Sequence, residues 1–182
     1  MSAAEDAPVS WERWVARLRE RTADVDNPAH VAMLDCFVEH MASERSGDVE
    51  RFMRTMVDDC VYRSWGKLRP AGVPPPVRGR EEIRALYEHM MLDRRGGFPE
   101  FEHDMERFWV GEDGIAMDGV LHRLARTDEL EALGEPVPAG ADPQDEHVVS
   151  RRTALFISFR DGRMVGEDLY YDSTSTVTPV AR

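Results

Sequence analysis

The sequence predicts an α+β protein: a curved antiparallel sheet with helices on one face. Within its 182 residues, segments with apolar residues at helical spacing lie mainly in the first half, and long segments rich in β-branched and aromatic residues lie in the second half. Short turn sequences join two pairs of the later segments, as expected between antiparallel strands. Helices followed by antiparallel strands are typical of the α+β class.

Apolar spacing and capping residues set the expected helices. Asn27 supplies an N-cap for a helix that Gly47 ends, and Asp48 can cap the next helix. The expected helices cover about 11–18, 28–45, 49–56 and 83–91. The apolar positions that define them are Trp11, Trp14, Val15 and Leu18; Val31, Leu34, Val38 and Met41; Val49, Phe52, Met53 and Met56; and Ile83, Leu86, Tyr87, Met90 and Met91.

The expected strands follow from residue type and from the turns between them. Gly111 and Gly114 bracket one tight turn, and Asp161-Gly162 is a strong hairpin signal. The strands are expected at 59–65, 101–110, 115–126, 148–160 and 164–175.

Length and charge predict one domain with an acidic insertion. Residues 97–146 hold 14 acids and three bases, a net charge of -11 out of -12 for the whole chain. The segment 128–146 has seven acids, no base and several Gly and Pro residues, so we expect a solvated acidic loop. We expect a single domain over 28–176, preceded by a helical extension (1–27) and followed by a tail (177–182).

Composition and motifs argue against several classes of partner and cofactor. The net charge of -12 repels phosphate, so we expect neither nucleic acid nor membrane as a partner. No apolar run reaches the ~20 residues of a membrane span, and the N-terminus lacks the pattern of a signal peptide, so we expect a cytoplasmic protein. Two cysteines and no His-Glu-x-x-His or Gly-rich phosphate motif lead us to expect no metal and no cofactor.

The order of these elements and three local stretches resemble the nuclear transport factor 2-like superfamily, in particular its SnoaL-like polyketide-cyclase branch. The stretches are 58–64, 79–87 and 161–172. The resemblance implies a cone-shaped, curved antiparallel sheet wrapped around three helices, with a small-molecule pocket between the sheet and the helices. This fold hosts isomerases, dehydratases, cyclases, epoxide hydrolases and non-catalytic binding domains.

The resemblance places Asp172 at the position of the general acid/base proposed for SnoaL-like cyclases. Strand alternation puts Asp168, Tyr170 and Asp172 on one face, which we assign to the pocket, and Leu169 and Tyr171 on the other. A carboxyl group in an apolar cup has a raised pKa and can exchange a proton with a ketone or enol. The alternative is that Asp172 caps a turn.

Alternation in the strand 101–110 directs His103 inward. The acidic row that includes Glu102 is expected to face water, so His103, Met105 and Trp109 are expected to line the pocket. His103 would then assist Asp172 as an acid or base. The alternative is a structural histidine that is hydrogen-bonded within the core.

Three further residues are candidates for substrate binding. Tyr62 and Tyr87 can donate a hydrogen bond to an oxyanion, or can be core aromatics with one satisfied hydroxyl. His122 shares a face with Asp118, but neither face of its strand is clearly apolar, so the pattern leaves open whether His122 lines the pocket.

The sequence lacks the residues that two mechanisms of this fold require. The resemblance places Ser64 where ketosteroid isomerases carry their base aspartate, and no Arg-x-Asp pair of the epoxide-hydrolase type falls within a long strand. We therefore expect a cofactor-free isomerase, cyclase or dehydratase that moves a proton on a small hydrophobic, oxygenated molecule. The alternative is a non-catalytic ligand-binding or dimerisation domain. We also expect a homodimer through the convex face, with Leu169 and Tyr171 in the interface.

Overall fold

A computed structural model describes residues 8–65, 76–92, 101–131 and 134–180. Its helices are α1 (Trp11–Arg21), α2 (Pro28–Ser46), α3 (Val49–Arg54), α4 (Gly79–Leu92) and α5 (Thr127–Leu130). Its strands are β1 (Met56–Trp65), β2 (Val77–Arg78), β3 (Phe101–Val110), β4 (Gly114–Arg126), β5 (Glu146–Arg160), β6 (Arg163–Tyr171) and β7 (Thr176–Pro179).

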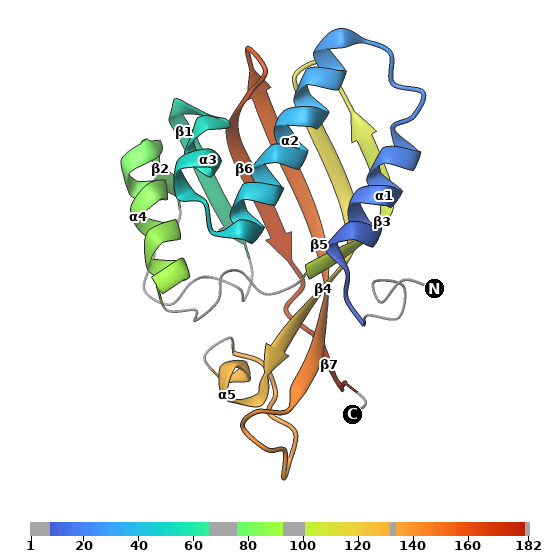
Figure 1. Ribbon diagram of the computed structural model, residues 1–182, viewed down its shortest axis with the longest axis vertical. Coiled ribbons are helices and arrows are strands. Elements are labelled where there is room, and N and C mark those ends of the chain that lie inside the picture. Colours follow the sequence, from blue (N-terminus) through green and yellow to red (C-terminus); the bar gives the residue numbers. More distant parts are fainter. Residues whose placement is uncertain (1–7, 66–75, 93–100, 132–133, 181–182) are drawn as a thin grey trace.

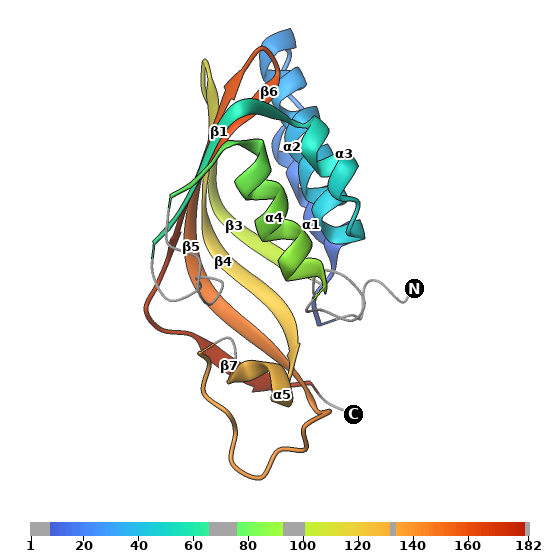
Figure 2. The ribbon, with the colours of Figure 1, turned by 90° about the vertical axis from the view of Figure 1, so that its left-hand side faces the viewer.

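The strands form one curved sheet in the order β2-β1-β6-β5-β4-β3, with β7 paired to β5. All pairs are antiparallel except β1 with β6. Helices α1 to α4 lie on one side of the sheet, which curves around them (Figure 2). We call this side the concave face and the opposite side the convex face. The expected α+β class and curved sheet are confirmed.

The residues expected to delimit the helices do so. The side chain of Asn27 accepts a hydrogen bond from the Ala29 amide at 3.0 Å, and Gly47 ends α2 with a φ of 72°. Asp48 caps α3 by accepting from the Arg51 amide at 2.9 Å. Local chemistry therefore determines where these helices begin and end.

The C-terminal part of the sheet differs from expectation. β6 ends at Tyr171, four residues early, and β7 pairs with β5 where a tail was expected. The hairpin of β4 and β5 extends beyond the helices, and α5 and β7 lie at its far end (Figure 1). A small second core there contains Ala125, Leu130, Val149 and Val177.

The segment 128–146 is not entirely solvated. Leu130 is fully buried, and the buried Glu135 carboxylate accepts hydrogen bonds from Arg151 at 2.7 Å and Arg123 at 3.5 Å. The hydroxyl of Ser175 also donates to Glu135. One acid of this segment therefore anchors it to the concave face, because the strands place two guanidinium groups there.

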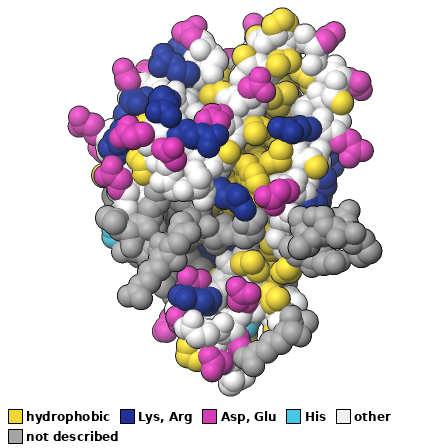
Figure 3. Space-filling view, viewed as in Figure 1, with side chains coloured by type: hydrophobic (Ala, Val, Ile, Leu, Met, Phe, Trp, Pro, Cys, Tyr) yellow, Lys and Arg dark blue, Asp and Glu magenta, His cyan; other side chains and the backbone are white. Residues whose placement is uncertain are grey.

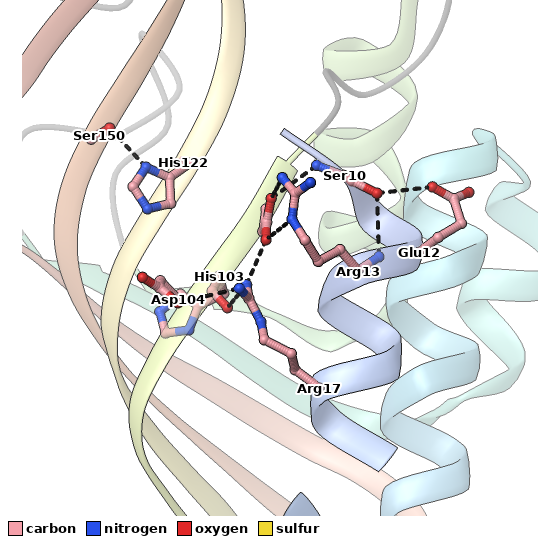
Figure 4. A network of polar contacts seen from close by, with 9 residues as sticks. Ser10, Glu12, Arg13, Arg17, His103, Asp104, His122 and Ser150 are labelled. Atoms are coloured by element: carbon pink, nitrogen blue, oxygen red, sulfur yellow. Dashed lines mark hydrogen bonds and ion pairs between the residues drawn. The ribbon is translucent and has the colours of Figure 1, made fainter. Parts of the chain in front are cut away.

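Helix α1 packs against β3 and changes the expected surface of that strand. Trp14 is fully buried and meets Phe37 edge to face at 5.8 Å. Glu102 was expected to face water, but it is buried under α1 and accepts from Arg13 at 2.8 Å and Arg17 at 2.6 Å (Figure 4). Burial by itself raises the pKa of Glu102, but the hydrogen bonds from Arg13 and from the Ser10 amide outweigh it, and the pKa is lowered.

None of the helices in the described ranges combines the length and the apolar character that a membrane-spanning helix needs.

Candidate functional site

Strand register shows which row of β6 lies on the concave face. Glu167, Leu169 and Tyr171 stand opposite Ile157, Leu155 and Thr153 of β5, and these three β5 residues are buried. The alternate β6 residues stand opposite the exposed row of β5. Glu167, Leu169 and Tyr171 therefore point toward the helices.

The assignment of Asp168 and Tyr170 to the concave face is wrong. Tyr170 is 43% exposed on the convex face and stacks on Trp65 with ring centroids 5.9 Å apart. Asp168 forms an ion pair with Arg63 at 3.2 Å. The alternation itself is correct, but the helices cover the row that also contains the apolar Val165 and Leu169.

Asp172 likewise lies outside the concave face. Its side chain is exposed, and its carboxylate accepts hydrogen bonds from the Thr174 amide at 3.2 Å and the Ser173 hydroxyl at 3.4 Å. These bonds, the Thr174 amide first, lower the pKa of Asp172, the opposite of the expected rise. The geometry matches the alternative role of Asp172, that of capping a turn.

A different carboxyl group has the expected electrostatic character. Burial, followed by the charge of neighbouring Asp168, raises the pKa of Glu167 to about 7. Its side chain keeps some accessible surface. Within the described residues, no hydrogen bond or ion pair holds the Glu167 carboxyl. Sequence reasoning missed Glu167, although its row carries Val165 and Leu169.

Three tyrosines lie in the same region of the concave side as Glu167. Tyr62 is its register partner on β1, Tyr171 lies on its own strand, and Tyr87 comes from α4 and meets Tyr62 edge to face at 6.3 Å. Burial is the main reason that the pKa of each tyrosine is raised, and the charge of Glu167 adds to the rise in all three. Tyr62 and Tyr87 thus occupy the region expected of them.

A buried hydrogen-bond chain leads from Tyr62 into the helices. The Tyr62 hydroxyl lies 2.9 Å from Nε2 of His40, and Nδ1 of His40 lies 2.6 Å from Oγ1 of Thr55. Burial lowers the pKa of His40 to about 3, so this imidazole is neutral. His40 was not among the residues expected at the site, although it follows Met33 and Phe37 along the buried stripe of α2.

His103 is buried and points inward, as predicted. Its Nε2 lies 2.6 Å from Oγ1 of Thr153, and burial, followed by His122, lowers its pKa to about 4. No hydrogen bond or ion pair in the described part of the chain links His103 with Asp172. The expected catalytic pair is therefore not assembled, and the bond to Thr153 matches the structural alternative.

A bulge in β3 separates Met105 from Trp109. The register shifts between Met105 and Arg107, so Met105 is buried whereas Trp109 is 51% exposed on the convex face. Opposite the bulge lies Gly119, with a φ of 153°, where a Cβ atom would fall 2.0 Å from the Asp104 carbonyl oxygen. The expectation for Met105 is confirmed and that for Trp109 is wrong, because simple alternation fails across a bulge.

His122 was a candidate for substrate binding, but it does not line the concave face. It lies on the row of β4 that faces away from the helices, and its Nδ1 is 2.8 Å from the Ser150 hydroxyl (Figure 4). Its neighbours Leu121 and Arg123 occupy the concave row, opposite the buried Arg151 and Val149.

Neither a surface hollow nor a group of metal-ligating side chains offers a second candidate site in the described residues. A surface hollow of about 390 Å³ lies between the turn joining α1 to α2 and the end of β3, and none of its lining residues is buried. It holds none of the candidate residues, so we place the site at Glu167. In the described ranges, no group of three His, Cys, Asp or Glu side chains is arranged to hold a metal ion.

The sequence matches a known family along most of its length. The family model described as a SnoaL-like domain matches residues 37–167. This chain belongs to the SnoaL-like domain family. The resemblance noted from the sequence is therefore confirmed. A search of curated protein sequences finds no match.

Solved structures share the fold of this SnoaL-like domain at low sequence identity. An NTF2-like protein from Anabaena variabilis has a TM-score of 0.55 at 12% identity, over 82% of this chain and 95% of that chain. A putative SnoaL-like polyketide cyclase from Shewanella denitrificans has 0.54 at 14%, over 77% and 90%. A Δ5-3-ketosteroid isomerase from a Mycobacterium species has 0.54 at 20%, over 81% and 98%.

Proposed function

We propose that the concave face of this SnoaL-like domain binds a small apolar molecule with an oxygen function, and that Glu167 exchanges a proton with it without a cofactor. The observation that carries the proposal is the carboxyl of Glu167, whose pKa burial raises to about 7. A general acid or base works best when its pKa lies near the working pH.

The surroundings of Glu167 support a ligand site on the helix-covered side. Glu167 keeps some accessible surface, and burial is the main cause of its raised pKa. A carboxyl group with both properties is partly desolvated and still open to a ligand. Hydrophobic side chains also gather along the middle of the helix-covered side, with charged groups around them (Figure 3).

The residues around Glu167 suit an oxygenated aromatic or polycyclic molecule. Leu169, Tyr171, Tyr62 and Tyr87 supply apolar and aromatic surface. The similar fold of a Δ5-3-ketosteroid isomerase and of a putative polyketide cyclase supports a ligand of this class. Proton transfer at a carbon next to a carbonyl requires one carboxyl of suitable pKa and no cofactor.

A non-catalytic ligand-binding domain is the second candidate. Ser64 favours it, because Ser64 stands opposite Leu169 on the concave face, where the resemblance places the base aspartate of ketosteroid isomerases. With Ser64 at that position, the carboxylate that ketosteroid isomerases use as a base is missing there.

Paired variants of neighbouring residues test the proposal. A thermal-shift screen of hydrophobic ketones, lactones and polyketide-like aromatics identifies a ligand, and turnover is then compared in wild type, Glu167→Gln and Asp168→Asn. We expect Glu167→Gln to keep the affinity and lose a factor of about 10² or more in turnover. Asp172→Asn is the control and should keep turnover, and Asp168→Asn, which removes only the smaller cause of the raised pKa of Glu167, should keep most of it. Undiminished turnover in Glu167→Gln removes Glu167 from the mechanism, and binding with no turnover in wild type selects the second candidate.

We also propose a homodimer through the convex face. The expectation that Leu169 and Tyr171 lie in this interface is wrong, because both residues are on the concave face. Instead, Trp65, Phe156 and Tyr170 form an exposed aromatic cluster, with Phe156 edge to face on Tyr170 at 6.0 Å. Exposed apolar patches of this kind mark interfaces. Sedimentation at micromolar concentration should give twice the chain mass, and a single 20.8 kDa species contradicts the dimer.

A further inference from the structure

Strand β3 ends the sheet on one side, and we call the edge of β3 that faces away from β4 the outer edge. Among the described strands, none pairs with this edge, and β3 is 10 residues long. An unpaired edge of this length offers backbone N–H and C=O groups to a strand of another chain. The groups that lie against the outer edge therefore decide whether a strand can be added there.

Helix α1 places a row of arginines along the outer edge. Nη2 of Arg17 donates to the His103 carbonyl oxygen at 3.3 Å, and Nη1 of Arg21 donates to the Glu106 carbonyl oxygen at 3.4 Å. Residues four apart lie on one side of a helix, about 6 Å from each other along its axis. Successive arginines of α1 can therefore bond to successive points of the strand.

Two arginines of the row also reach around the outer edge. Arg13 and Arg17 donate to the Glu102 carboxylate at 2.8 Å and 2.6 Å (Figure 4). Glu102 stands opposite His122, whose row of β4 faces away from the helices. A helix on the concave side thus binds a carboxylate of the convex row, so these guanidinium groups lie across the edge itself.

The two bonded carbonyl groups show which residues of β3 bond outward. In an antiparallel strand, the N–H and C=O of one residue point to the same edge, and those of the next residue point to the other edge. His103 and Glu106 both face the outer edge although they are three residues apart, because the bulge between Met105 and Arg107 shifts the alternation. The residues that face the outer edge are therefore Phe101, His103 and Met105 before the shift, and Glu106, Phe108 and Val110 after it.

The outer edge of a second copy of the chain complements this pattern. If two β3 strands pair antiparallel with His103 opposite Phe108 of the second copy, every outward-bonding residue meets another outward-bonding residue. The same alignment puts Asp104 opposite Arg107 of the second copy, and the two-fold symmetry repeats this pair. Backbone direction and side-chain charge therefore favour the same register.

We infer that the outer edge of β3 is a pairing surface for a second copy of this chain, and that Arg17 and Arg21 of α1 keep it closed. The arginines occupy carbonyl oxygens that an added strand would need, and their side chains lie where its backbone would run. Helix α1 precedes residues 37–167, which match the family model, so the closing element lies outside the matched domain. The pairing is also separate from the proposed dimer of the convex face, because it uses backbone groups at an edge.

Two double variants of the full chain, with the same loss of charge, test the inference. Arg17→Ser, Arg21→Ser opens the edge, and the bonds of Arg13 to Glu102 keep α1 in place. Arg19→Ser, Arg54→Ser is the control, because both of these arginines are exposed and neither bonds to β3 in the part of the chain that the structure describes. Near-UV circular dichroism compares the packing of both variants with that of the wild type.

The probe is a fluorescent peptide with the sequence of residues 101–110, and its binding is measured by anisotropy. We expect the edge-opened variant to bind it at least tenfold more tightly than the wild type or the control. A second peptide, with Asp104 and Arg107 exchanged, has the same composition but places like charges opposite each other. We expect the edge-opened variant to bind this second peptide at least tenfold more weakly than the first.

Two results overturn the inference. If the edge-opened variant binds the first peptide no better than the control does, the arginines do not close the edge. If it binds both peptides equally, the edge does not select the β3 strand of a second copy. Arg17→Ser and Arg21→Ser as single variants each free one carbonyl and should show intermediate affinity, which keeps the test valid if the double variant does not fold.

Discussion

Neighbouring residues with similar side chains behave differently on the two faces of the sheet. On β6, Glu167 faces the helices without a partner in the described residues, and its pKa rises to about 7. The next residue, Asp168, faces outward and pairs with Arg63 at 3.2 Å. On β5, Arg151 is buried and bonds to Glu135, whereas Arg152 is exposed and bonds to Glu106 at 2.6 Å.

Ion pairing and burial together separate the charges that stabilise the structure from a charge that can change near neutral pH. The charged groups named on the convex face are solvated and paired; at one of them, Glu106, the hydrogen bond from Arg152 lowers the pKa of the carboxyl. On the concave face, two arginines bind Glu135, whereas Glu167 has no ion-pair partner among the residues that the structure describes and has a pKa of about 7.

The largest contrast is expected between Arg151 and Arg152. Arg151→Met removes a buried partner of Glu135 and a hydrogen bond to the Asp172 carbonyl oxygen at 2.9 Å, so we expect a loss of about 3–5 kcal/mol in the free energy of unfolding. Arg152→Met should leave stability almost unchanged, because that pair is in water. Urea denaturation of both variants measures the difference, and equal losses would show that the two faces do not differ.

A smaller, pH-dependent contrast is expected for Glu167. Its folded pKa of about 7 lies above the ordinary 4.5, so its contribution to stability is complete below pH 4.5 and is lost as the pH rises toward 7. Glu167→Gln lacks this loss and should gain about 2–3 kcal/mol on wild type between pH 5 and pH 8. Urea titrations at both pH values measure it. Asp168→Asn removes only the smaller cause of the raised pKa and should keep most of the wild-type loss; parallel curves for wild type and Glu167→Gln contradict the raised pKa.

His103 acts in the opposite direction with pH. Its folded pKa of about 4 lies below the ordinary 6.5, so its contribution is complete above pH 6.5 and is lost as the pH falls toward 4. His103→Gln should recover about 2 kcal/mol relative to wild type between pH 7 and pH 5. Thermal or urea unfolding across this range provides the measurement. An identical acid dependence in the variant would mean that His103 is already charged in the folded protein.

The smallest effect on folding is expected at the aromatic cluster of the convex face. Phe156 is 50% exposed, so Phe156→Ser should change the stability of the monomer by no more than about 0.5 kcal/mol. If the convex face is the dimer interface, the same variant should sediment at lower mass than wild type at equal concentration. Ser158→Ala, on the same exposed row, serves as the control. A dimer that survives Phe156→Ser places the interface elsewhere.

Local interactions made much of the fold predictable from the sequence. The caps at Asn27, Gly47 and Asp48 act within a few residues, so the bounds of α2 and the start of α3 follow from neighbouring side chains. Strand β3 has the expected bounds, and the Asp161-Gly162 turn has positive φ at both residues, as this hairpin signal requires. Alternation also paired the correct residues on each side of β6.

The choice of face and the candidate site depended on contacts between distant segments. Which row of β6 is concave depends on where α2 and α4 pack, and a shift of one residue exchanges Glu167 for Asp168. The bulge opposite Gly119 turned Trp109 outward, α1 buried Glu102, and the arginines of β4 and β5 captured Glu135. The sequence by itself determined the elements, because helix caps and turns are local. The tertiary structure alone decided which charges lost their water, because desolvation depends on all the atoms that surround a group.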